Sequence, residues 1–180
     1  MLFGALVACS SPAPVLYTIT PVPGAVHSGS PKIIVLRQIG LARYLDRPEI
    51  VASTENNRME VMSNDWWGEP LGPMLSRVLT EELGQRLPQS TVLSETGAVS
   101  APPDATIELN MRRLDKDAAG NLILQAQAGV TFKGRSAPVL RNFNFIKAPP
   151  TTGISGQVAA ASTAIGELAD GLALMVLARP

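Results

Sequence analysis

The stretch that decides the fold lies in residues 106–145, where three segments alternate apolar and polar side chains. They read TIELNMR (106–112), NLILQAQAGVTFK (121–133) and VLRNFNF (139–145), and in the third segment Arg141 breaks the apolar set. Successive side chains on a strand point to opposite faces, so a period of two predicts strands with one face on a core and the other toward water. Short turns at residues 117–120 and 134–136 separate the segments, which predicts that they pair as antiparallel neighbours.

The segment after this meander predicts a long helix. Residues 158–177 form a largely apolar run of 20 residues, which is long enough to cross a bilayer. Its apolar residues recur every three or four positions, however, and Glu167 and Asp170 interrupt it. An acidic group inside a bilayer costs up to about 3 kcal/mol. We therefore predict an amphipathic helix that packs on the sheet rather than a membrane span.

The chain before the meander predicts a second helix and several short strands. Apolar residues at helical spacing from Leu71 to Leu87 indicate the helix, with Pro70 and Pro73 near its start and Pro88 at its end. Short apolar segments indicate strands at residues 15–19, 32–37, 49–53, 58–62 and 90–93. The first long run, 32–37, is almost continuously apolar, which predicts burial on both faces. An Asn pair at 56–57 predicts a tight hairpin turn.

These patterns together predict an α/β (α+β) fold, with a single mixed, largely antiparallel sheet and two main helices packed on one face. A chain of 180 residues is expected to fold as one domain with a sizeable core. The 15 Lys and Arg residues balance the 15 Asp and Glu residues, and no basic stripe with interleaved aromatic residues points to nucleic acid.

The residue types also argue against catalysis. With one cysteine and one histidine, His27, the chain offers no internal disulfide and no clustered metal ligands. It holds neither a nucleophile elbow of the Gly-x-Ser-x-Gly kind nor a phosphate-binding loop. Asp115, Lys116 and Asp117 fit the chemistry of a hairpin turn better than that of a catalytic pair. We therefore predict no enzyme activity, no metal and no cofactor.

Cys9 closes a short apolar run, and the tetrapeptide Leu6-Val7-Ala8-Cys9 has the pattern of a bacterial lipobox. The alternative is an ordinary buried thiol. The residues Ser10-Ser11-Pro12-Ala13-Pro14 that follow cannot continue a helix or strand, which favours the lipid anchor. Because residues 1–8 contain no Lys or Arg and are short for a signal peptide, we expect the natural start to lie upstream of Met1.

Several segments carry a resemblance to one family. They read IIV (33–35), ARYLDRPEIV (42–51), WGEPL (67–71) and LSRVL (75–79). They resemble the ABC-type transport auxiliary lipoprotein family, also called PqiC-like or DUF330. The resemblance implies a non-enzymatic, periplasm-facing lipoprotein that accompanies MCE-domain and ABC transporter subunits, which move lipids between membranes. Ser10 is not the Asp that retains many lipoproteins at the inner membrane, so we expect the outer membrane.

On this interpretation the chain has three parts. Residues 1–8 are the remnant of a signal peptide, residues 9–31 are the lipidated N-terminus, tether and short first strand, and residues 32–180 are the auxiliary lipoprotein domain. The first function class is tethering or docking of the transporter. Formation of a homo-oligomer is a further expectation. The second is a solute- or lipid-binding lipoprotein that carries an apolar ligand in its own pocket, and an envelope enzyme ranks last.

The candidate partner-binding residues are Tyr44, Arg47 and Trp66. The segment around Tyr44 and Arg47 has two interpretations: a turn whose apolar residues pack, or an exposed loop that contacts a partner, because Tyr and Arg are favoured at interfaces. Adjacent strand residues point to opposite faces, so we expect one of Trp66 and Trp67 to fill the core. The family resemblance implies that Trp67 is the packed one, which leaves Trp66 to contact a partner or lipid.

Overall fold

The computed structural model describes residues 13–53 and 57–178, and within this part of the chain one mixed sheet of nine strands carries two main helices. The predicted α+β class is confirmed. The elements, in chain order, are β1 (Val15–Tyr17), β2 (Ile33–Leu36), β3 (Gly40–Leu41), the 3-10 helix η1 (Arg43–Leu45), β4 (Glu49–Ser53), β5 (Met59–Trp67), α1 (Leu71–Arg86), β6 (Thr91–Ser94), β7 (Ala105–Lys116), β8 (Leu122–Phe132), β9 (Val139–Lys147) and α2 (Gly153–Leu177).

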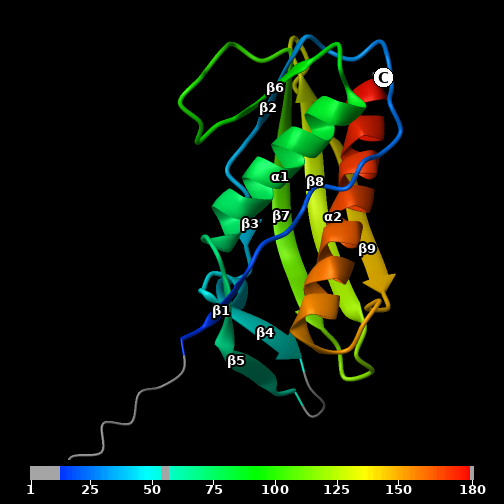
Figure 1. Cartoon of the computed structure of the whole chain (residues 1–180). Coiled ribbons are helices and arrows are strands. Elements are labelled where there is room, and N and C mark those ends of the chain that lie inside the picture. Colours follow the sequence, from blue (N-terminus) through cyan, green and yellow to red (C-terminus); the bar gives the residue numbers. More distant parts are fainter. Residues whose placement is uncertain (1–12, 54–56, 179–180) are drawn as a thin grey trace, which may run out of the picture.

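The strands β7, β8 and β9 form the antiparallel meander that the alternating segments predict. Their inward-facing residues, among them Ile107, Leu124 and Phe143, share one buried core with both helices. In the connecting turns Gly120 and Gly134 adopt φ angles of 89° and 81°, which glycine tolerates because it has no Cβ. The two helices lie side by side on the same face of the sheet, as predicted (Figure 1).

The other edge of β7 organises the rest of the sheet. It pairs in turn with β2, β3 and β4, each parallel to it. β6 flanks β2, while β5 and then β1 flank β4. The prediction that residues 32–37 are buried on both faces is wrong, because the helices cover one face of the sheet. Ile34 and Leu36 are fully buried, but Ile33 and Val35 are only half-buried.

The β4–β5 hairpin departs from the sequence pattern in one respect. β5 continues past the predicted end at Met62, into residues that pair in parallel with β1. Its register on β4 shifts between Glu49 and Val51, and such an irregularity breaks the period of two that a sequence pattern relies on. Asn57 has the positive φ angle, 60°, that the predicted tight turn needs, while residues 54–56 lie outside the described part of the chain.

The long C-terminal helix α2 packs on the sheet, as predicted. It is long and apolar enough to cross a membrane, but 72% of its most apolar 18-residue window is buried inside the protein. It contacts β7, β8 and β9. Its two acidic residues meet cations from neighbouring elements: Glu167 lies 2.5 Å from Lys147 Nζ, and Asp170 lies 2.6 Å from Arg86 Nε. The charges that interrupt the apolar run therefore serve the contacts between elements.

Residues 18–31 form a strap that lies over the two helices (Figure 1). This segment was predicted to belong to a tether, but its backbone is hydrogen-bonded to the body of the protein. Thr20 N donates to Ser162 Oγ on α2 at 3.1 Å, and Val22 N donates to Glu82 Oε1 on α1 at 2.7 Å. A Pro- and Gly-rich segment forms no ladder of its own, so these N–H groups find side-chain acceptors on the helices instead.

Candidate docking face and lipid anchor

Tyr44, the first predicted contact residue, lies on η1 with its side chain half-buried. Its hydroxyl donates to Oδ2 of Asp115 on β7 at a distance of 2.5 Å. Burial raises the pKa of the Tyr44 phenol, and the hydrogen bond to the Asp115 carboxylate raises it further. The phenol is therefore a protonated donor at neutral pH, and it fastens η1 to the sheet.

Asp115 is fully buried, so the prediction that it belongs to a hairpin turn is wrong. β7 continues through this position, and Arg113 donates to both carboxylate oxygens, from Nη2 at 2.6 Å and from Nε at 3.3 Å. A buried carboxylate is costly unless it is paired and hydrogen-bonded, as it is here by Arg113 and Tyr44. Asp117 does have the predicted turn role, because its Oδ1 accepts from the backbone N–H of Asn121 at 2.8 Å.

Arg47 and Trp66, the other two predicted contact residues, flank Glu49. Arg47 Nε donates to Glu49 Oε2 at 3.0 Å, and Glu49 pairs with Trp66 across the β4–β5 ladder. A hydrogen bond from its own backbone N–H, and then the Arg47 guanidinium, lower the pKa of Glu49. Trp66 is half-buried, and its Nε1 donates to Ser63 O at 2.9 Å. Its neighbour Trp67 is buried in the core, as predicted.

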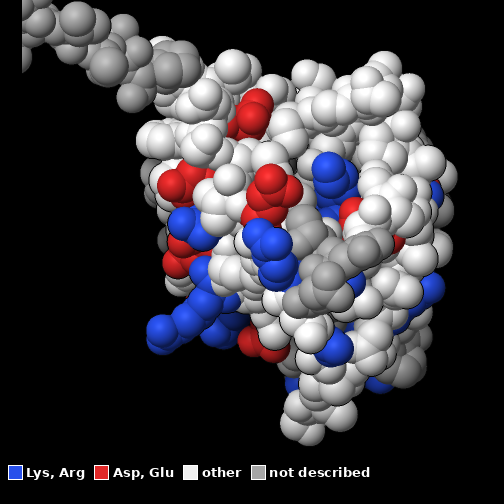
Figure 2. All heavy atoms as spheres, turned by 90° about the horizontal axis from the view of Figure 1, so that it is seen from below, with Lys and Arg blue, Asp and Glu red and all other residues white. Residues whose placement is uncertain are grey.

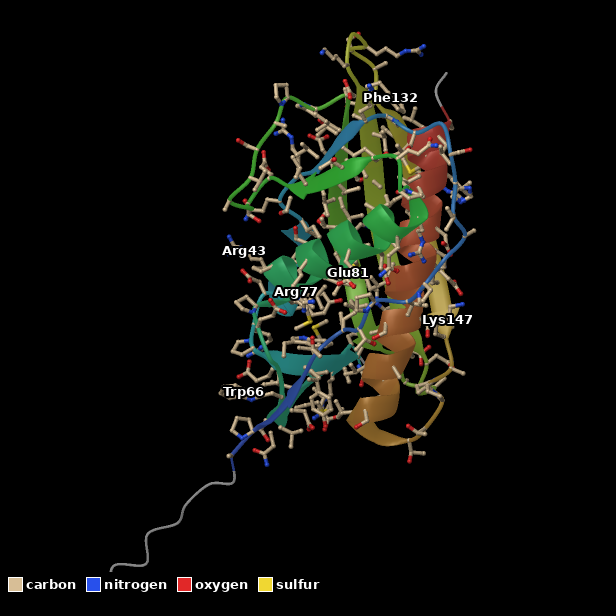
Figure 3. All side chains as sticks on the ribbon, turned by 45° about the horizontal axis from the view of Figure 1, so that its top comes forward. Arg43, Trp66, Arg77, Glu81, Phe132 and Lys147 are labelled. Atoms are coloured by element: carbon tan, nitrogen blue, oxygen red, sulfur yellow. The ribbon has the colours of Figure 1, made fainter. Side chains whose placement is uncertain are left out.

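The structure thus relates two of the three candidate residues, Arg47 and Trp66, through Glu49, while the Tyr44 hydroxyl is hydrogen-bonded inside the fold. Figure 3 shows Trp66 toward the end of the body where the N-terminal trace leaves it, and Phe132 toward the opposite end. Cys9, the predicted lipidation site, lies outside the described residues.

A cleft that the sequence pattern did not indicate opens between α1 and residues 38–41, with a volume of about 400 Å³. Leu41 and Pro73 contribute apolar surface, and Asp46 and Ser76 contribute polar groups. Ser76 lies on the buried side of α1, with its hydroxyl 2.8 Å from that of Ser94. The one sequence feature that could have indicated this cleft is a serine, Ser76, within the apolar stripe of the helix. Serine occurs at many helix positions, so this feature alone does not predict a cleft.

The described part of the chain holds no group of three or more His, Cys, Asp or Glu side chains that could bind a metal ion. The arrangement of Arg47, Glu49 and Trp66 offers an aromatic surface beside an exposed ion pair. Such a surface suits contact with another molecule.

A comparison with protein families identifies the chain. The family described as "ABC-type transport auxiliary lipoprotein component" matches residues 17–173. The chain belongs to this family. The resemblance inferred from the segments between residues 33 and 79 is therefore confirmed, and the match extends it over both helices and the meander. No functionally curated protein matches the chain.

Two solved structures with TM-scores above 0.5 illustrate the fold of this family member. The crystal structure of an uncharacterized protein superposes with a TM-score of 0.77 at 15% identity, covering 91% of this chain and 98% of the other. Protein XCC0632 from Xanthomonas campestris, assigned to DUF330, gives a TM-score of 0.67 at 18% identity, covering 89% and 90%. A PelC dodecamer from Paraburkholderia phytofirmans gives 0.47 at 12% identity, covering 86% and 94%.

Proposed function

We propose that this auxiliary lipoprotein serves an MCE-type, ABC-driven system that moves lipids between the inner and outer membranes. The family match over residues 17–173 is the observation that carries the proposal. Cys9 would carry the lipid anchor at the periplasmic face of the outer membrane, the exposed surface around Tyr44 and Arg47 would dock the transporter, and Trp66 would contact either the partner or the lipid. The lipobox pattern of residues 6–9 and the Ser at position 10 support the anchor and its membrane.

The position of β1 supports an anchor at one end of the body. The described chain begins at Ala13, four residues after Cys9, and leads directly into β1. Four residues of fully extended chain reach at most about 14 Å. A lipid on Cys9 would therefore hold the β1 end, with Arg47 and Trp66, close to the membrane surface. Two or more acyl chains make such an anchor stable, because each buried methylene contributes about 0.8 kcal/mol.

Cys9→Ala should move the protein from the membrane fraction to the soluble fraction and leave its stability unchanged, because the family match begins after this residue. The chain would be expressed behind a lipoprotein leader, fractionated and examined by mass spectrometry of its N-terminal peptide. Ser10→Ala is the matched control and should remain membrane-bound. An unmodified Cys9, or a Cys9→Ala variant that stays in the membrane fraction, would overturn the anchor.

Arg47→Glu should weaken co-purification with the MCE-domain subunit by about tenfold, which corresponds to about 1.4 kcal/mol of binding. The reason is that Arg47 is exposed, and interface Arg residues carry a large share of binding energy. Arg37→Glu is the control, because Arg37 is also an exposed, ion-paired arginine but lies at the end of β2. If both variants co-purify like the parent, the docking face does not include Arg47.

Carriage of an apolar ligand by the lipoprotein itself is the competing function. Ligand pockets enclose most of their ligand in about 300–1,000 Å³ of mostly apolar space. The cleft beside α1 has a volume of about 400 Å³, but it is open to solvent and partly polar. We therefore assign the lipid-carrying step to the transporter and the docking step to this protein.

A further inference from the structure

Four apolar side chains gather on one face of the sheet at the β1 end, where no helix covers them. Leu16, Met59 and Val61 are 62%, 49% and 37% exposed, and Trp66 is half-buried. We call these four residues the anchor-end patch. Large apolar side chains exposed together, unlike those scattered singly, mark a contact surface.

The strand register places the four side chains on the same face. Leu16 on β1 pairs with Trp66 on β5, so both point to one side. On β4, Glu49, Val51 and Ser53 alternate with inward residues, and their partners on β5 are Trp66, Val61 and Met59. Ile50, between them, belongs to the core under the helices, and so does Trp67. The anchor-end patch therefore lies on the side away from the helices.

The patch also lies at the end of the molecule where the chain arrives from Cys9. Leu16 is seven residues beyond Cys9, and the body is entered through β1. Figure 2, which looks at this end, shows acidic and basic side chains of both signs interspersed with uncharged surface. The ion pair between Arg47 and Glu49 at the border of the patch has no net charge, so it does not oppose contact with a lipid surface.

We propose that the anchor-end patch rests on the membrane beside the lipid anchor, with Trp66 at the level of the lipid headgroups. This inference rests on the proposed acylation of Cys9. An indole ring with one polar edge suits the boundary between headgroups and acyl chains, where Trp is enriched. The Leu, Met and Val side chains of the patch lose contact with water on the same surface. A lipid surface is favoured over a protein partner because the short connection from Cys9 brings it within reach.

This contact would fix the orientation of the body. An acyl anchor alone attaches the protein through a short segment and leaves the body free to turn on the membrane. A second contact through the patch on β1 and β5 would hold the β1 end down and point the β8–β9 turn, beyond Phe132, away from the membrane (Figure 3). A docking partner would then meet the body in one constant orientation.

Tryptophan fluorescence tests this contact directly, because Trp66 and the buried Trp67 are the two tryptophans of the chain. The full chain, expressed behind a lipoprotein leader and acylated, would be reconstituted into vesicles of phosphatidylethanolamine and phosphatidylglycerol with brominated acyl chains. Bromine quenches indole at short range, so we expect loss of the Trp66 emission and its protection from aqueous iodide. Trp66→Phe should remove the quenched component and leave the emission of Trp67.

Two variants distinguish contact of the patch with the membrane from mere nearness to the membrane caused by the lipid anchor. Leu16→Ser combined with Val61→Ser should restore the emission of Trp66 and its access to iodide, while the protein stays acylated and vesicle-bound. Leu140→Ser is the matched control, because Leu140 is 65% exposed but lies at the start of β9, and it should change nothing. If the protein is acylated and vesicle-bound but the emission of Trp66 is not quenched, the membrane contact of the patch is wrong while the lipid anchor stands. This holds whether iodide reaches Trp66 or a second protein covers it. An unacylated Cys9 would overturn the proposed anchor and this contact together.

Discussion

Arg86→Ala should lower the free energy of unfolding by about 3 kcal/mol, because it removes a buried side chain that hydrogen-bonds to three elements and leaves buried acceptors without a donor. The Arg86 side chain is 1% exposed, although it carries a full charge. It lies between α1, α2 and the strap, so its removal should loosen all three at once.

The reason lies in the acceptors that Arg86 satisfies. Nε donates to Asp170 Oδ1 at 2.6 Å, and Nη2 donates to Gly166 O at 3.0 Å, both on α2. Nη1 donates to Val22 O on the strap at 3.1 Å and to Glu82 O on its own helix at 3.2 Å. Alanine would leave the buried carbonyl oxygens of Gly166 and Glu82 without this donor, and an unsatisfied buried polar group costs about 1–3 kcal/mol. Asp170 would lose its ion pair, although its side chain is 44% exposed and can be hydrated.

Urea denaturation of parent and variants would measure this effect. Arg77→Ala is the control, because Arg77 also belongs to α1 and forms an ion pair, with Glu69 at 2.5 Å, but its side chain is 48% exposed. Exposed ion pairs contribute about 0–1 kcal/mol, so this variant should differ little from the parent. If Arg86→Ala cost no more than Arg77→Ala, the buried arginine would not be the link between the helices and the strap.

The meander and the two helices could be predicted because their signals are local. In residues 121–133 the apolar residues recur at every second position, and their side chains on β8 are buried, although Ile123 and Gly129 on the other face are buried as well. The same holds for the spacing of apolar residues in α1, where the predicted positions Leu75, Leu79 and Leu83 are fully buried. Local periodicity is enough when one face of an element meets one continuous core.

Asp115 could not be placed from the sequence, because its environment is set by residues far along the chain. Its partner Tyr44 lies 71 positions away, and β7 changes register between Met111 and Arg113. A bulge interrupts the alternation that would have carried the strand as far as Asp115. An Asp near a Gly-containing turn is common for backbone reasons, so the sequence favoured the turn.

The strap, and the proximity of Arg47 and Trp66 to Glu49, also could not be predicted from local sequence. Residues 18–31 have no periodicity, and their fixed position depends on acceptors from two helices, including Ser162 and Glu82. Arg47 and Trp66 could be named as contact residues from their types, but not as neighbours, because the shifted register of β5 on β4 decides that Trp66 lies opposite Glu49. That the exposed Leu16 belongs to the same surface as Trp66 follows only from the pairing of the two residues in the sheet.

Glu82 should make the protein less stable as the pH rises from about 4.5 to about 7. Its side chain is fully buried, and Oε2 has no hydrogen-bond partner in the described structure. Burial raises the pKa of Glu82 from 4.5 to about 7, although the hydrogen bond from Val22 N and the charge of Arg86 act in the opposite direction. The folded protein therefore binds this proton more tightly than the unfolded chain does.

The sign of the effect follows from that difference. Between these two pKa values the folded state holds more protons than the unfolded state, so the free energy of unfolding falls as the pH rises. One pKa unit corresponds to about 1.4 kcal/mol, so the loss from this group reaches about 3 kcal/mol above pH 7. The stabilisation by the protonated form is fully present below about pH 4.5.

Glu82→Gln should remove this dependence, because glutamine stays neutral and its Oε1 can still accept from Val22 N. Compared with the parent, the variant should be about equally stable near pH 4.5 and more stable by about 3 kcal/mol at pH 8, as urea denaturation across that range would show. Glu81→Gln is the matched control, since Glu81 is the adjacent but exposed carboxylate of α1, and its difference from the parent should stay small at every pH. A Glu82→Gln variant that is less stable than the parent at pH 8 would mean that the ionised carboxylate, held between Val22 N and Arg86, stabilises the strap. In that case burial would not be the dominant influence on Glu82.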